Sequence, residues 1–143
     1  MTPARFAVMR RFDIVDPDGG LYLTRWRVIQ TPWGSLYVHR IARPDWRPVL
    51  HDHPWSFVSF ILRGGYTEVR FDPIALRLTT RRVRRLNVVR RHDAHYITAL
   101  DRTPTWSVLL VGARRRHWGY LSFDMAGHTI TDTYRWHRWE LGQ

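Results

Sequence analysis

Two histidines separated by one residue are the feature of this sequence best suited to chemistry. His51 and His53 flank Asp52. Alternate side chains of a strand point to the same face. This places the two backbones roughly 6.6 Å apart and lets both imidazoles reach one metal ion at roughly 2.1 Å. A metal needs a third ligand, and His92-Asp93-Ala94-His95, at the start of a later strand-like segment, supplies candidates. Neutral imidazole suits several transition metals, so the spacing alone does not select one.

Short extended segments, rather than helices, must position these histidines. Runs rich in aromatic and β-branched residues end at Gly, Pro, Asp or Arg, and they occupy 21–30, 35–42, 56–62, 66–71, 86–91, 95–100, 106–111 and 117–123. No window shows a 3.6-residue apolar stripe of helical length. This pattern predicts an all-β chain, an antiparallel sandwich or barrel. The length of 143 residues predicts a single domain, residues 1–143.

Gly64 and Gly65 lie between two of these segments and favour a two-residue hairpin turn with positive φ at both positions. Such a turn would pair Arg63 with Tyr66, Ile61 with Glu68, and Ser59 with Arg70. If the alternation continues through Pro54, one face of the hairpin carries polar and aromatic residues: His51, His53, Trp55, Ser59, Tyr66, Glu68 and Arg70. We interpret that face as the lining of a pocket. The other face is apolar and needs a cover, which indicates a homodimer; it comprises Val58, Phe60, Leu62, Val69 and Phe71.

The histidine and glycine positions resemble the two motifs of the cupin superfamily. His51-Asp52-His53, followed by Gly64-Gly65, is similar to the first motif, and the segment 94–100, which contains His95, is similar to the end of the second. The resemblance covers about residues 35–112. It implies a single-domain cupin-type β-barrel, also called a double-stranded β-helix or jelly roll, that binds a metal. The segment 116–120 and the Trp-rich tail are similar to small cupins of phage and bacterial genomes.

Two departures from the cupin pattern concern the ligands. The first-motif Glu would fall at Phe57 or Val58, neither of which can ligate a metal, so the chain resembles the three-His cupins, among them thiol dioxygenases. Glu68 could supply a carboxylate instead. In the second motif, Arg91-His92-Asp93 replaces the usual Pro-x-Gly, and His92 is an alternative ligand that a strand would place on the other side from His95.

These residues predict a metal-dependent oxygenase that acts on a small anionic substrate. We expect His51, His53 and His95 to hold the metal, with iron as first choice and Ni, Zn, Mn or Co as alternatives. The expected catalytic residues are Glu68, Tyr66 and Tyr96, and the expected substrate-binding residues are Arg63, Arg70, Trp55 and Ser59. One alternative is a metal-independent sugar or small-molecule epimerase or isomerase, with His53 as base and Tyr66 or Tyr96 as acid. Another is a non-enzymatic module that binds a ligand or nucleic acid. His39 is interpreted as structural.

The charge of the chain is unusual, because 23 basic residues stand against 12 acidic ones and give a net charge of +11. Every basic residue is Arg, which indicates GC-rich coding as much as polyanion binding. The densest stretch contains Arg81, Arg82, Arg84, Arg85, Arg90 and Arg91. Alternation along a strand would place residues 82, 84 and 90 on one face and residues 81, 85 and 91 on the other. Because burying unpaired guanidinium groups is costly, we expect at least one of these sets to be exposed or paired with Asp or Glu. Nucleic-acid binding is therefore considered but not favoured. The chain has no Cys and no apolar run of membrane or signal-peptide length, so we expect a cytoplasmic protein without a membrane segment.

Overall fold

The computed structural model describes residues 9–47 and 49–121, and these residues form antiparallel strands and no helix. The larger sheet contains, in spatial order, β1 (Arg10–Val15), β2 (Leu21–Gln30), β3 (Gly34–Ile41), β10 (Thr105–Gly112), β5 (Phe57–Arg63) and β8 (Leu86–Val89). The smaller sheet contains β11 (Tyr120–Leu121), β4 (Leu50–His51), β9 (His95–Leu100), β6 (Tyr66–Asp72) and β7 (Arg77–Val83). The predicted all-β fold is confirmed.

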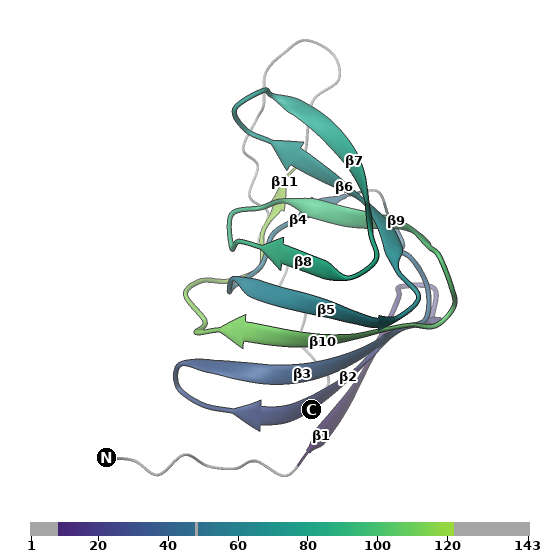
Figure 1. Ribbon diagram of the computed structural model, residues 1–143, viewed down its shortest axis with the longest axis vertical. Helices are drawn as coiled ribbons and strands as arrows, with labels where there is room; N and C mark the ends of the chain where they lie inside the picture. The colour runs from purple at the N-terminus through teal and green to yellow at the C-terminus, as the bar shows by residue number, and fades with distance from the viewer. Residues whose placement is uncertain (1–8, 48, 122–143) are drawn as a thin grey trace.

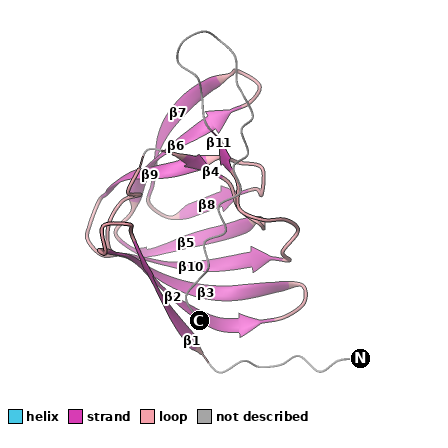
Figure 2. Cartoon of the chain, turned by 180° about the vertical axis from the view of Figure 1, so that it is seen from behind, coloured by secondary structure: helices cyan, strands magenta, loops and turns pink. Residues whose placement is uncertain are grey.

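The two sheets bury their inner faces against each other. In Figure 1 the larger sheet runs from β1 at the bottom to β8 near the middle, while β6 and β7 of the smaller sheet lie at the top. Figure 2 shows the same arrangement from behind. One core cluster joins residues of both sheets: Leu23, Ile41, Tyr66, Val83 and Ile97. A second cluster belongs to the larger sheet and contains Phe57, Val89, Leu109 and Val111. Apolar residues at alternate positions thus hold the sheets together.

The predicted pairing across Gly64-Gly65 is wrong. Both glycines have positive φ, 89° and 149°, but the turn carries the chain from one sheet into the other. β5 pairs with β10 and β8, while β6 pairs with β9 and β7. Ser59 therefore lies opposite Asn87, and Glu68 lies opposite Arg81. The turn sequence determines the local backbone, but burial of both inner faces decides which strands pair.

The arginine-rich stretch likewise spans two sheets instead of one strand. β7 ends at Val83 in the smaller sheet, and β8 begins at Leu86 in the larger one. The expected division into two faces of one strand is therefore wrong, because the chain changes sheet at Arg84 and Arg85. All six arginines are exposed, and three of them are paired: Arg81 with Glu68, and Arg82 and Arg84 with Asp101.

Two expectations from the sequence concern other parts of the chain. The Trp-rich tail lies outside the described residues. Within the described residues there is no helix with the length and apolar character needed to cross a membrane.

Gly64 combines a positive φ with a close approach to Thr105. A Cβ at Gly64 would lie 2.5 Å from the Thr105 hydroxyl oxygen and 3.2 Å from its Cα. Gly19 also has a positive φ, 82°, but a Cβ there meets nothing within 4 Å. We expect Gly64→Ala to lower the free energy of unfolding by about 3 kcal/mol and Gly19→Ala by only about 1 kcal/mol. Urea denaturation of both variants measures this difference, and equal costs would contradict the close approach.

Candidate metal centre

Two histidines of one segment and a third from a distant strand meet in the smaller sheet. The ligand nitrogens of His51, His53 and His95 all lie within 4.8 Å of one another. Their positions follow from strand pairing, because His51 on β4 lies directly opposite His95 on β9. His53 follows two residues later, and its ring centroid is 5.1 Å from that of His95 and 5.2 Å from that of His51. The structure thus brings together the three residues proposed from the sequence as metal ligands.

The donor set fits a transition metal ion. Three nitrogens at roughly 2.1 Å from one ion lie roughly 3.0–3.6 Å apart, so small ring movements suffice from the present positions. The Nε2 atoms of His53 and His95 are 2.8 Å apart and face each other. Burial lowers the pKa of His51, and burial together with the neighbouring His95 lowers the pKa of His53 well below 6.5. Both rings are therefore neutral at physiological pH, which is the form that binds metal.

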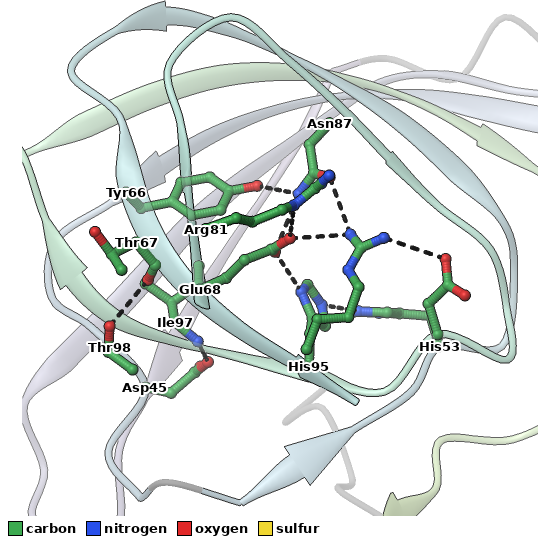
Figure 3. A network of polar contacts seen from close by, with 12 residues as sticks. Asp45, His53, Tyr66, Thr67, Glu68, Arg81, Asn87, His95, Ile97 and Thr98 are labelled. Carbon is green, nitrogen blue, oxygen red and sulfur yellow. Dashed lines mark hydrogen bonds and ion pairs between the residues drawn. The ribbon is translucent and has the colours of Figure 1, made fainter. Parts of the chain in front are cut away.

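Glu68 orients His95 from the side opposite His53 (Figure 3). Its Oε2 accepts a hydrogen bond of 2.7 Å from His95 Nδ1, which leaves the Nε2 lone pair directed toward the other histidines. Further donors reach the same carboxylate: Arg81 Nε at 2.7 Å, Arg70 Nη2 at 3.0 Å and Asn87 Nδ2 at 3.1 Å. Glu68 thus lies behind His95 and holds its tautomer.

The buried carboxylate of Glu68 stays ionised because of these partners. Burial by itself would raise the pKa of Glu68, but the hydrogen bond from His95 and the guanidinium groups of Arg70 and Arg81 lower it to about 2. The carboxylate is fully buried, with 0% of its residue surface exposed. A negative charge with good hydrogen bonds strengthens the basicity of the imidazole that it contacts.

Asp52, between the two histidines, points away from them and fixes a neighbouring segment. Its carboxylate accepts a hydrogen bond of 2.9 Å from the Gly119 amide and pairs with Arg116. This contact holds Trp118 beside the centre, with its ring centroid 4.7 Å from that of His53. Phe57 packs edge-on against His53 at 4.9 Å. Phe57 is one of the two positions at which the cupin pattern would place its Glu, and here it is an apolar neighbour of His53.

The histidines form part of the wall of a cavity of about 820 Å³. Trp55, Ser59 and Tyr66, which the sequence analysis placed at the pocket, all line it. The Tyr66 hydroxyl accepts a hydrogen bond of 2.7 Å from Asn87 Nδ2. Burial raises the pKa of Tyr66 to about 12, so its phenol is protonated. The cavity is largely aromatic, and its rings belong to Tyr22, Trp46, Trp55, Phe57, Tyr66, Trp118 and Tyr120.

Four other residues proposed from the sequence do not line this cavity. Arg63 is exposed at the end of β5. Arg70 is engaged by Glu68 at 3.0 Å and by Asp93 at 3.4 Å. Tyr96 lies between His95 and Ile97 on β9 and therefore points to the other face of that strand. His92 is exposed and accepts a hydrogen bond of 3.0 Å from its neighbour Arg91.

Arg25 on β2 and His39 on β3 are among the residues of the cavity wall that sequence reasoning missed, as are Asp16 and Asp45. Arg25 Nε donates a hydrogen bond of 2.9 Å to His39 Nε2. Burial and the charge of Arg25 lower the pKa of His39 well below 6.5, so this ring is neutral. The sequence did carry a signal, because Arg25 is two residues from Leu23 and His39 is two residues from Ile41, so each shares a strand face with a core residue. Only the packing of the sheets, however, shows which face of these strands is interior.

Replacing Glu68 by Gln tests its role behind His95. Glu68→Gln leaves Arg70 and Arg81 without their buried anion, so we expect the free energy of unfolding to fall by about 3 kcal/mol. Because His95 then faces a neutral amide instead of a charged carboxylate, its ring is less basic and less firmly oriented, and metal affinity should fall roughly 10- to 100-fold. Isothermal titration with Zn²⁺ or Co²⁺ measures this affinity. Asp101→Asn is the control, because it removes a carboxylate that is paired with Arg82 and Arg84. This variant should leave the metal affinity unchanged. Equal affinities in wild type and Glu68→Gln would contradict the role.

No protein-family model and no curated protein sequence matches this chain. Solved structures with a similar fold include hydroxypropylphosphonic acid epoxidase from S. wedmorenis, with a TM-score of 0.51, 16% identity and coverage of 73% of this chain and 55% of that one. Streptomyces albus HEPD, with 2-hydroxyethylphosphonate and Fe(II) bound, has a TM-score of 0.57, 14% identity and coverage of 75% and 24%. Streptomyces PAC13 with uridine has a TM-score of 0.54, 11% identity and coverage of 86% and 93%.

The chain thus spans little more than half the length of the epoxidase and about a quarter of HEPD. At these identities the likeness concerns the fold. It agrees with the two antiparallel sheets of this chain. The fold of this chain is therefore that of the cupins, in a variant with three clustered histidines.

Proposed function

We propose that this protein binds a divalent metal through His51, His53 and His95 and is a metal-dependent oxygenase of small anionic substrates. The observation that carries this proposal is the cluster of three histidines on the wall of an 820 Å³ cavity. Three neutral ligands leave the charge of a divalent ion uncompensated and several coordination positions open. Such a centre attracts an anionic or chelating substrate.

Iron is the metal that we propose first. Bound Fe(II) would supply the redox chemistry needed to activate O₂ as well as positions for a substrate. Two of the proteins with a similar fold support this choice, since two solved structures of the protein named HppE and the structure of HEPD contain Fe(II). HEPD also holds a phosphonate substrate.

The residues around the centre then have distinct roles. Glu68 is a positioning residue, because it contacts His95 and is saturated by its other partners. Tyr66 and Ser59 present hydroxyl groups to the cavity, while Trp55 provides an apolar wall for the substrate. Tyr66 is protonated and hydrogen-bonded to Asn87, so it is suited to donate a proton or a hydrogen bond.

A metal-independent isomerase is the second candidate, because the same cavity holds a neutral His53 and a protonated Tyr66. These two groups could serve as base and acid. The structure of PAC13 with uridine is of a similar fold and nearly the same length as this chain. Metal content separates the two candidates.

A nucleic-acid-binding module is less well supported. Arg81, Arg82 and Arg84 are already paired with Glu68 or Asp101. Pairing with carboxylates reduces the positive charge that this part of the surface offers to phosphates.

A homodimer is the partner that the outer face of the larger sheet suits best. Strands β5, β8 and β10 expose apolar side chains there: Phe60, Leu62, Leu86, Val88 and Leu110 are each 43–63% exposed. The register places Phe60 opposite Leu86 and Val108, so the patch is continuous. Contiguous exposed apolar patches of this kind are uncommon on monomers and mark interaction surfaces. In a chain of net charge +11, a face made of apolar residues is where two copies can meet without repulsion.

Metal analysis tests the proposed centre. Protein purified without chelator should carry about one equivalent of metal, and Fe(II), Co(II) or Zn(II) should raise the thermal unfolding temperature of the apoprotein. His51→Ala with His53→Ala should abolish both effects, whereas His92→Ala removes an exposed histidine and should change neither. With Fe(II) loaded, uptake of O₂ should increase when phosphonates or carboxylates are added. A wild-type protein without metal and without thermal response would refute the centre and favour the isomerase.

Sedimentation velocity tests the dimer. We expect the wild type to sediment with twice the mass of the chain at micromolar concentration. Leu110→Glu places a charge inside the apolar face and should produce monomers. Ile74 is 95% exposed on the turn between β6 and β7, away from this face. Ile74→Glu is therefore the matched control and should remain dimeric. A wild type that stays monomeric at 100-fold higher concentration would contradict this interface.

A further inference from the structure

Arginines gather in a second cavity that adjoins the one with the three histidines. This cavity has a volume of about 460 Å³ and lies between β1, β2, β3 and the segment after β10. Arg10, Arg25, Arg27 and Arg114 line it, and no Asp or Glu is among the described residues of its wall. We propose that this cavity is an oxyanion site, which binds a phosphate, phosphonate or carboxylate group.

Strand register places three of these guanidinium groups on one face. Arg10 on β1 lies directly opposite Arg27 on β2, and Phe12 lies opposite Arg25. Like charges that face each other across a strand pair destabilise the sheet. The acidic residue nearest in sequence, Asp13, lies on the outer face, where Arg11 and Thr24 bind it. A bound anion would remove the repulsion between Arg10 and Arg27.

Within the residues that the structure describes, one donor of these arginines is buried without a partner, and three of the guanidinium groups have no carboxylate beside them. Arg27 Nε is buried and has no hydrogen-bond acceptor among the described residues. Arg25 donates through Nε to His39, and neither Arg25, Arg27 nor Arg10 forms an ion pair with a carboxylate in the described part of the chain. A half-buried guanidinium with a buried, unsatisfied N–H and no counter-ion is costly, so it is rarely left unpaired without a function.

Aromatic rings hold the guanidinium groups in position. Arg10 and Arg27 both lie over the ring of Phe12, at 5.1 and 5.6 Å from its centroid. Arg25 lies over the ring of Tyr37 at 5.0 Å. Stacking uses the flat face of a guanidinium and leaves its N–H edges available for two parallel hydrogen bonds to an oxyanion. The site is therefore organised before a ligand arrives.

The oxyanion site is connected to the histidine centre. Ile14, Arg25, Trp55 and Arg114 line both cavities. On the basis of the proposed function, an elongated substrate would place its reacting end at the three histidines and an anionic end at Arg25 and Arg27. This assigns substrate recognition to Arg25 and Arg27 instead of Arg63 and Arg70, which lie outside the large cavity.

Binding of inorganic phosphate to chelator-treated protein, at constant ionic strength, tests this site without metal or turnover. We expect phosphate to raise the thermal unfolding temperature of the wild type, with the affinity measured by calorimetry. Arg27→Met should raise the unfolding temperature in phosphate-free buffer, because it removes a half-buried charge without a counter-ion together with its buried, unsatisfied Nε–H. It should also weaken phosphate binding at least about tenfold. A structural role for Arg27 predicts the opposite change in unfolding temperature.

Two further variants complete the test. Arg10→Met changes an exposed residue of the same cavity and should weaken phosphate binding with little effect on folding. Arg63→Met removes the same charge outside both cavities and should bind phosphate like the wild type. The proposed site would be wrong if phosphate raised the unfolding temperature of the wild type no more than chloride does. It would also be wrong if Arg63→Met lost as much phosphate affinity as Arg27→Met. The double variant His51→Ala with His53→Ala should keep phosphate binding, so a failure of the metal centre is distinguishable from a failure of this site.

Discussion

The buried carboxylate of Glu68 is the interaction on which the rest of this site depends. It lies on β6 in the smaller sheet, and Asn87, one of its hydrogen-bond donors, lies on β8 in the larger sheet. A fully buried charge is tolerated only when it is paired and hydrogen-bonded, and here Arg70, Arg81, Asn87 and His95 satisfy it. The same network that links the sheets thus selects the tautomer of His95. Folding and ligand geometry are consequently coupled through one side chain.

The interior of the protein combines neutral imidazoles with unpaired guanidinium groups. His51, His53 and His39 are kept neutral by burial, and Arg25 lies in contact with His39. Two acids line the large cavity, and both have partners: Asp16 pairs with Arg43, and Asp45 accepts a hydrogen bond from the Ile97 amide. Arg25 and Arg27 have no carboxylate partner among the described residues, so an anionic ligand would supply the counter-charge there. This is the physical reason why we favour an anionic substrate.

The fold by itself does not decide among the candidate activities, because one fold supports unrelated chemistries. The structures to which this chain is similar include an epoxidase and a protein with bound uridine. The site has to distinguish them instead: Phe57 packs against His53, and the carboxylate of Glu68 stands behind His95. The three-histidine cluster is therefore accompanied by an acid that orients one of its members.

The sequence by itself determined the fold class and the three histidines. Alternation over short segments predicts strands because every second side chain must be buried, and His51-x-His53 depends on the same period. Positive φ at Gly64 and Gly65 was also predictable, since glycine tolerates that conformation. These features are local, so they can be read from neighbouring residues.

Only the tertiary structure decided which strands pair and which polar residues meet. The Gly64-Gly65 turn joins two sheets, so Ser59 lies opposite Asn87 instead of Arg70. Arg25 and His39 line the cavity, whereas Arg63 is exposed and Arg70 is bound to Glu68. Such contacts join residues distant in sequence. They depend on how the inner faces of two sheets bury apolar surface against each other, which no local pattern specifies.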